Sequence, residues 1–411
     1  MKDVPIVAGL DLGSTKTCAV IAQATKSDRA IGAKILGVGI CRETGVRGGL
    51  VRDIEETTRS IVSAMRDAQR MAGTQVPPIV CGIAGEHVHL RTSPGLVSVT
   101  GDEISRGDVE RVNDVATAVS LGQDRELLHS IPQGYRVDEQ DGISDPVGMS
   151  GMRLEVEMYL ISVASAAAQN VRKSVERAGY RLARLVFEPL ASSLSVLTAE
   201  ERELGCLLLD LGGASTGMAV IRGGRVRNIA SFPYAGDRIT SDIVHGLSVT
   251  QADAERLKEK WGAAYTPLVD PDEAFELPST PGQGTRQAKR ELIAHIIHQR
   301  LDEVFGLMHA ELEKAGVVGQ LPAGVVLTGG TAQLPGIVEL AREVFAMPAR
   351  IGSPTRGISG LIDSVNAPRY AVPAGLVLYA AHEESIHGAE ITNFGVDKWL
   401  GPVKRWFQDF F

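Results

Sequence analysis

Residues 6–16 read IVAGLDLGSTK, and residues 18–22 read CAVIA. An apolar run therefore ends in Asp11 and a short turn that carries glycine, two hydroxyl groups and Lys16, and a second apolar run follows at once. Two short apolar runs joined by a glycine-containing turn are typical of a β-hairpin. The stretch predicts two buried strands whose turn exposes backbone N–H groups, hydroxyls and one ammonium group.

The same design recurs in the second half of the chain. Residues 207–217 read LLLDLGGASTG and lead into MAVI at 218–221. Each copy has D-L-G, then hydroxyl residues, then an A-V-I strand. Two copies of one hairpin predict a duplicated, pseudo-symmetric architecture. Because 411 residues are too many for one ordinary domain, we expect two domains, each with its own core.

A third glycine turn follows another apolar run. Residues 325–336 read VVLTGGTAQLPG, and a helical spacing of apolar residues begins at Ile337. A buried strand thus ends in paired glycines shortly before a helix. Since glycine has no Cβ, a flat ring can lie against this backbone. We assign Gly329 and Gly330 to the adenine of a nucleotide, with Gln333 beside them.

Together the three turns predict an ATP site. Backbone N–H groups of glycine-rich turns can approach phosphate oxygens closely, hydroxyls add donors, and lysine adds a positive charge. Asp11 and Asp210, each at the end of a strand, can hold a hydrated Mg²⁺ between the two halves. Hairpin chemistry alone explains one such turn, but two matched copies with the third in order favour ATP. The predicted phosphate-binding residues are Gly13, Ser14, Thr15, Lys16, Gly212, Gly213, Ser215 and Thr216.

Composition argues against several other classes of protein. The net charge of −8 leaves no excess of Lys and Arg to neutralise phosphates, so we expect no nucleic-acid partner. The four cysteines form no C-x-x-C pair, which argues against a zinc or redox motif. The N-terminus lacks a signal-peptide pattern and no eighteen-residue apolar stretch occurs, so a cytoplasmic protein that does not span a bilayer is expected.

The three turns resemble those of the actin, sugar-kinase and DnaK-type chaperone superfamily, in which ATP lies between two duplicated halves. Within it, the chain is similar along nearly its whole length to the FtsA family of bacterial cell-division proteins. The resemblance implies an α/β, actin-like two-domain ATPase fold with duplicated halves, an inserted α+β subdomain and a C-terminal amphipathic helix. Further segments that carry it are IPQGY at 131–135, DPVGMSG at 145–151, LASS at 190–193, PYAG at 233–236 and TSDI at 240–243.

The resemblance also implies a division of the chain into subdomains. The inserted subdomain is expected on the side opposite to its place in ordinary actins, where it would serve filament contacts and other division proteins. The expected boundaries are 1–80, completed by 165–198 and 357–382, for subdomain IA; 81–164 for the inserted subdomain IC; 199–236, completed by 306–356, for IIA; 237–305 for IIB; 383–393 for a linker; and 394–411 for the amphipathic helix.

Two further segments contribute candidate site residues through the resemblance. AERLK at 254–258 is similar to the helix that contacts ribose and adenine in bacterial actins, which nominates Glu255 and Lys258. An amphipathic helix with an exposed charged face is the alternative. FEPLA at 187–191 resembles the E-P-x-A turn whose acid positions the attacking water. Glu188 would then act with Asp11 and Asp210 in slow ATP hydrolysis, the alternative being an acid favoured by a helix N-terminus.

The C-terminal tail has the spacing of an amphipathic helix. Its apolar residues follow one helical face, and charged or polar residues occupy the other. Such a helix is expected to lie on an anionic membrane surface, with docking on the protein's own core as the alternative. The predicted membrane-contacting residues are Trp399, Leu400, Val403, Trp406, Phe407, Phe410 and Phe411.

The resemblance implies a polymerising protein at the cytoplasmic face of the inner membrane, at the division site. It would bind the C-terminal peptide of FtsZ through residues 237–305, bind copies of itself in a filament, and bind later division proteins through residues 81–164. A pilus-assembly adaptor of the PilM type and a soluble actin-fold metabolite kinase are the alternatives. Neither needs the amphipathic tail, so deletion of the tail separates these functions.

Overall fold

The first half of the molecule is built on a six-stranded sheet. The computed structural model describes residues 5–26, 31–278 and 286–390. The sheet has the order β11-β6-β1-β2-β3-β19, in which β1, β2 and β3 are antiparallel and β6, β11 and β19 run parallel to their neighbours. The strands are β1 (Ile6–Leu12), β2 (Lys16–Lys26), β3 (Ile31–Arg42), β6 (Ile79–Ile83), β11 (Leu182–Phe187) and β19 (Ile358–Gly360).

A second sheet repeats the first. Its order is β14-β13-β12-β17-β18, with β12, β13 and β14 antiparallel and β17 and β18 parallel to their neighbours. The run β3-β2-β1-β6-β11 of the first sheet has the same pattern, so the duplicated architecture is confirmed. The strands are β12 (Cys206–Leu211), β13 (Thr216–Arg222), β14 (Arg225–Phe232), β17 (Val325–Thr328) and β18 (Ala349–Ile351).

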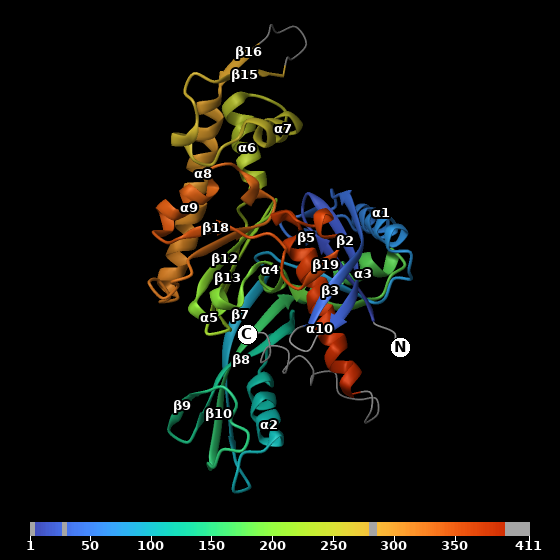
Figure 1. The fold of residues 1–411 in the computed structure, drawn as a ribbon, viewed down its shortest axis with the longest axis vertical. Helices are drawn as coiled ribbons and strands as arrows, with labels where there is room; N and C mark the ends of the chain where they lie inside the picture. The colour runs from blue at the N-terminus through green and yellow to red at the C-terminus, as the bar shows by residue number, and fades with distance from the viewer. Residues whose placement is uncertain (1–4, 27–30, 279–285, 391–411) are drawn as a thin grey trace.

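Helices cover both faces of the first sheet (Figure 1). A Cβ on Gly39 would lie 1.9 Å from the carbonyl of Ala64 in α1, and one on Gly9 would lie 2.9 Å from Leu376 in α10. Gly39 pairs with Ala19 and Gly9 with Val20, so the two glycines face opposite sides. The helices of this half are α1 (Ile54–Ala72), α3 (Ser165–Arg177), α4 (Glu188–Val196) and α10 (Ala371–Glu390), and the short hairpin β4 (Val46–Arg47) and β5 (Leu50–Val51) precedes α1.

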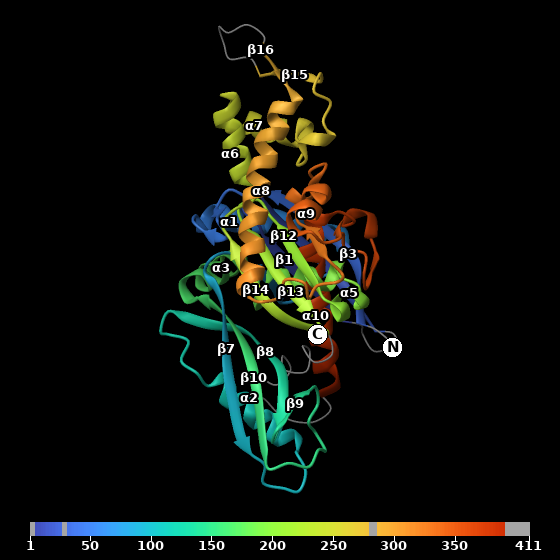
Figure 2. The same cartoon turned by 90° about the vertical axis from the view of Figure 1, so that its left-hand side faces the viewer.

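The inserted subdomain has its own core and lies at one end of the molecule (Figure 2). Its sheet has the order β7-β10-β8-β9 and is packed by one helix. The expected start at residue 81 is too early, because residues 81–83 belong to β6 and pair with β1 and β11 in the first sheet. The elements are β7 (Val88–Ser98), α2 (Arg106–Thr117), β8 (Arg125–Val137), β9 (Gln140–Ile143) and β10 (Arg153–Ala164).

The subdomain at the other end of the molecule is mainly helical (Figure 1). The expected boundary at residues 305 and 306 falls inside α8, a continuous helix whose buried face runs from Ile293 to Leu312 and joins this subdomain to the second sheet. The elements are α6 (Gly236–Leu247), α7 (Gln251–Trp261), η1 (Thr266–Leu268), β15 (Ala274–Leu277), β16 (Arg286–Lys289) and α8 (Arg290–Lys314). The short α5 (Ala199–Leu204), η2 (Thr331–Gln333) and α9 (Ile337–Phe345) pack around the second sheet, and η3 (Ile362–Ser364) and η4 (Pro368–Tyr370) precede α10.

The chain remains helical beyond the predicted end of the core. The sequence analysis predicts a linker from residue 383, but α10 continues to Glu390 because no proline or turn dipeptide interrupts residues 383–390. The predicted amphipathic helix at 394–411 lies outside the described residues. Within the described part of the chain, no helix has both the length and the apolar character that a bilayer span requires.

Burial of His382 in α10 makes the stability of this half depend on pH. Burial and the positive charge of Arg202 lower the pKa of His382 to about 4. The pKa of His382 in the folded protein is below its value of roughly 6.5 in the unfolded chain. The stability gained by burying the neutral ring is therefore fully present above roughly pH 6.5 and is lost as the pH falls toward 4. The wild-type protein should lose unfolding free energy when the pH is lowered from 7 to 5. In the His382→Gln variant this loss should be smaller by up to about 2 kcal/mol. Urea unfolding at both pH values measures this, and equal losses in both proteins would contradict it.

Candidate functional site

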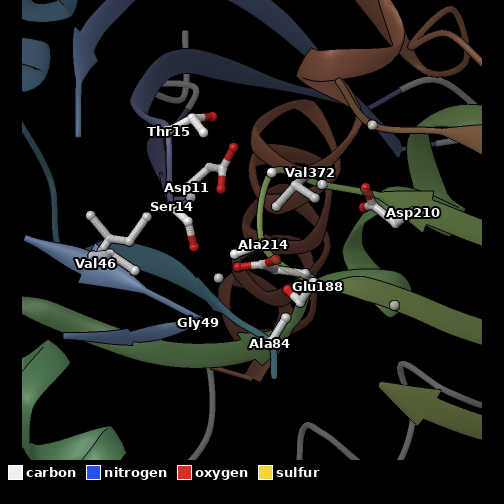
Figure 3. A pocket seen from close by; sticks show the side chains of 18 of the residues that line it. Asp11, Ser14, Thr15, Val46, Gly49, Ala84, Glu188, Asp210, Ala214 and Val372 are labelled. Carbon is white, nitrogen blue, oxygen red and sulfur yellow. The ribbon is translucent and has the colours of Figure 1, made fainter. Parts of the chain in front are cut away.

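The two halves enclose one large cavity. The space between its side chains amounts to about 910 Å³, part of it open to solvent. Both D-L-G turns and the third glycine turn line it, together with the start of α4 (Figure 3). Of the predicted site residues, those that line it are Asp11, Gly13, Ser14, Thr15, Lys16, Glu188, Asp210, Gly212, Gly213, Ser215, Gly329 and Gly330.

The two D-L-G turns occupy equivalent positions and approach each other. Asp11 pairs with Cys18 one step before the end of its hairpin, and Asp210 pairs with Gly217 one step before the end of the other. A Cβ on Gly213 would lie 2.7 Å from Cγ2 of Thr15, so the turns nearly touch across the cavity. Glycine at 213 therefore keeps space between backbone N–H groups that converge from both halves.

The first turn holds the best-defined charge pair of the cavity. Nζ of Lys16 lies 2.5 Å from Oδ2 of Asp11. Burial alone would lower the pKa of Lys16, but the charge of Asp11 and the hydrogen bond to it outweigh burial and raise the pKa above its ordinary value. Lys16 therefore stays positively charged and can bind an anion that enters between the turns.

Two further carboxyl groups face the cavity from different elements. Glu188 is the first residue of α4, and Asp210 lies at the end of β12. Burial and the negative charge of Asp11 raise the pKa of Asp210 to about 7. Burial and the charges of Asp11 and Asp210 raise the pKa of Glu188 well above its ordinary value. Negative charge is therefore concentrated in the cavity and is relieved by a proton or by a cation.

These residues fit a hydrated magnesium ion. Oδ2 of Asp210 is buried and accepts no hydrogen bond from the described residues, which leaves an oxygen available for a cation or its water. No group of three or more acidic, His or Cys side chains in the described ranges is arranged to hold a metal directly. This suits Mg²⁺, which usually keeps several waters and uses one or two carboxylates together with phosphate oxygens.

The third turn is tied to the second turn and to the start of α10. Gly329 has φ +89°, and its N–H donates to the carbonyl of Pro368 at 3.2 Å. The hydroxyl of Thr331 donates to the carbonyl of Gly212 at 2.7 Å. A Cβ on Gly329 would lie 2.5 Å from the carbonyl of Leu211. Only glycine therefore allows the third turn to pack this closely against the second.

Four predicted residues do not line the cavity. Thr216 is buried and donates to the carbonyl of Tyr234, and Gln333 is exposed with its side chain on the carbonyl of Gly330. Glu255 and Lys258 form an ion pair at 2.8 Å in α7. Lys258 is buried and donates to the carbonyl of Gly236, whose own N–H is bonded to Gly212, so it supports the second turn from behind. The exposed-face alternative for Lys258 is therefore wrong.

Several residues of the cavity wall were not found from the sequence. Arg369 of η4 adds a second positive side chain, and no ion pair joins it to an acid within the described ranges. Arg369 directly follows Pro368, whose carbonyl accepts the hydrogen bond from Gly329, but no pattern in the sequence predicts that these two segments pack together. The remaining wall of the first half is made by β4, β5, the end of β6 and α3, which are brought together only by the fold. These wall residues are Val46, Gly49, Val51, Gly82, Ile83, Ala84 and Val171.

Comparison with protein families finds relatives of this chain. The family model described as "Cell division protein FtsA" matches residues 207–375, and that described as "SHS2 domain inserted in FTSA" matches residues 85–162. The cell division protein FtsA of Pseudomonas aeruginosa is 37% identical over 411 residues, covering 98% of this chain and 97% of that protein. That of Escherichia coli strain K12 is 35% identical over 416 residues, covering 99% of this chain and 98% of that protein.

Solved structures with low sequence identity share the fold. The PilM–PilN type IV pilus biogenesis complex aligns with a TM-score of 0.65 at 17% identity, covering 91% of this chain and 98% of that chain. MreB5 of Spiroplasma citri bound to ADP aligns with a TM-score of 0.57 at 14% identity, covering 95% and 100%. Both likenesses support the actin-like architecture. The full-length relatives show that the chain belongs to the FtsA family of cell-division proteins.

Proposed function

We propose that this actin-like cell-division protein binds ATP between its halves, polymerises, and tethers FtsZ to the cytoplasmic membrane. The observation that carries the proposal is the pair of matched D-L-G turns facing one cavity, with Lys16 and three carboxyl groups between them. The structural relative MreB5 is bound to ADP, which supports a nucleotide in a cavity of this fold.

Different residues of the cavity would bind ATP and catalyse its slow hydrolysis. N–H groups of both turns and the Lys16 ammonium would bind the phosphates. Asp11 and Asp210 would hold Mg²⁺, which neutralises phosphate charge. Glu188, whose raised pKa makes it a stronger base than an ordinary glutamate, would orient the attacking water and accept its proton. The third turn would lie against the adenine.

A second cavity supports contact with the FtsZ peptide in residues 237–305. It has a volume of about 1210 Å³, much of it open to solvent. Apolar side chains of Leu247, Leu277 and Leu292 line it beside the basic Arg286 and Lys289. A groove that combines apolar and positively charged side chains suits a short peptide with apolar and acidic residues. We propose this groove as the docking place of the FtsZ C-terminal peptide.

Membrane attachment would depend on many tails at once. Full burial of one apolar side chain contributes roughly 1.5–3 kcal/mol, and burial at an interface is only partial. Ordering the tail costs roughly 1–2 kcal/mol per residue before hydrogen bonds offset it, so a single tail should bind weakly. A filament presents a row of tails, and the effective concentration of the later ones rises steeply. ATP-dependent assembly and membrane binding would therefore reinforce each other.

Co-sedimentation with anionic liposomes tests the proposal. We expect the full chain to pellet with the liposomes in the presence of Mg²⁺ and ATP, and much less without ATP. A shortened chain that ends at Asn393 should lose membrane binding but keep its affinity for ATP. The proposal would be contradicted if the shortened chain still bound the liposomes, or if neither chain bound them.

The same experiment separates the proposed function from the two alternatives. The likeness to the PilM–PilN complex has 17% identity and shows the fold alone. A PilM-like adaptor docks on a membrane protein's peptide, and a metabolite kinase acts in solution. For either of them, removal of residues 394–411 should leave membrane binding unchanged.

A further inference from the structure

A buried histidine of the inserted subdomain is bonded to the backbone that directly precedes Glu188. β11 is an edge strand of the first sheet, and β8 of the inserted subdomain packs beside it. His129 of β8 is 1% exposed, and its Nε2 accepts a hydrogen bond from the backbone N–H of Phe187 at 3.0 Å. Phe187 is the last residue of β11 and the N-cap residue of α4, so the bonded N–H directly precedes Glu188.

The histidine remains an acceptor at any physiological pH. Burial and the positive charge of Arg184 lower the pKa of His129 to about 3. The neutral ring with its lone pair on Nε2 is therefore maintained, which assigns the ring proton to Nδ1. Without this acceptor, a buried backbone N–H at the edge of the sheet would lose its partner, and the chain entering α4 would shift to find another.

The surroundings of His129 hold the imidazole ring in place. The ring of Tyr379 in α10 packs edge-on against it, with ring centroids 6.3 Å apart and planes at 69°. Tyr379 is fully buried, and Arg184 of β11 pairs with Glu383 of α10 at 3.1 Å. The inserted subdomain, the strand that precedes Glu188 and the helix α10 therefore meet in one packed cluster.

We propose that His129 is a positioning residue for Glu188. The packing of the inserted subdomain against β11 thereby controls the rate of ATP hydrolysis. This inference rests on the proposed role of Glu188 in hydrolysis. Displacement of a catalytic group by about 1 Å can reduce a rate about 100-fold, and the hydrogen bond to Phe187 acts one residue from the carboxyl group. His129 itself does not contact the nucleotide cavity.

The test compares variants of His129 in single-turnover hydrolysis of Mg²⁺·ATP by the full chain. His129→Leu removes the acceptor and should slow hydrolysis at least 10-fold, with the Kd for ATP changed less than 3-fold. His129→Gln places an amide oxygen near the position of Nε2 and should restore most of the rate. Tyr135→Phe is the matched control, because Tyr135 lies in the same strand as His129 but belongs to the core of the inserted subdomain, where the change removes a buried hydrogen bond with Asn113 of α2. It should leave the rate unchanged.

A double variant distinguishes positioning from general destabilisation. In a Glu188→Gln background, His129→Leu should cause no further loss of rate, whereas a structural defect would still add its own loss. If His129→Leu does not fold, His129→Asn replaces it, because the shorter amide cannot reach the Phe187 N–H. If the wild-type chain hydrolyses ATP and the His129 variants do so at the same rate, only the positioning role is overturned. A wild-type chain that hydrolyses no ATP would overturn the proposed hydrolysis, and the positioning role with it.

Discussion

Substitution Glu188→Gln should reduce ATP hydrolysis by about 100-fold or more, the usual size of a general-base effect. The amide has nearly the same shape but cannot accept a proton from water. ATP should bind at least as tightly as before, because the amide never carries the negative charge that an ionised Glu188 adds beside Asp11 and Asp210. Filament formation with ATP should therefore persist and last longer.

Phosphate release under single-turnover conditions, together with ATP binding at equilibrium, measures both parts of this prediction. Glu203→Gln is a suitable control, since Glu203 is an exposed glutamate of α5 that does not line the cavity. The control should behave as the wild type in both assays. Undiminished hydrolysis by the Glu188 variant would show that another group orients the water.

Substitution Gly329→Ala should weaken ATP binding by at least about 100-fold. The residue has φ +89°, and its new Cβ would lie 2.5 Å from the carbonyl of Leu211 and 2.6 Å from Oδ1 of Asp210. Contacts this short force the third turn away from the second, which separates the adenine side of the cavity from the phosphate side. The left-handed conformation alone costs an alanine roughly 1–2 kcal/mol.

Gly316→Ala separates these two effects. Gly316 also has a left-handed backbone, with φ +66°, but a Cβ there would meet nothing within 4 Å. The control should lose a similar amount of stability to backbone strain while its Kd for ATP stays unchanged. Equal ATP affinities in the two variants, measured by calorimetry, would contradict the packing argument for the third turn.

The sequence predicted the fold because its decisive signals are local. Each D-L-G hairpin is encoded within about fifteen residues, and Asp11 and Asp210 occupy the same register in the two copies. The same reasoning explains why the turn residues that line the cavity could be predicted. Turn residues must satisfy backbone geometry and bind the ligand at once, so their residue types reveal both.

The missed features depend on contacts between distant segments. Arg369 and Val171 reach the cavity only because α10 and α3 pack on the first sheet, and no spacing in the sequence encodes that. His129 reads as one more residue of a strand until the fold brings it to Phe187. The sequence predicts Lys258 beside the nucleotide, and only the fold shows that its ammonium group donates to the carbonyl of Gly236, behind the second turn.

A structure of the full chain with Mg²⁺ and a non-hydrolysable ATP analogue tests the central claim most directly. The account predicts that the triphosphate lies between residues 13–16 and 212–215, with Asp11 and Asp210 around the metal ion and the adenine beside Gly329 and Gly330. The carboxyl group of Glu188 should face the terminal phosphate across a water molecule. A nucleotide bound outside this cavity, or a metal ion remote from both aspartates, would contradict the account.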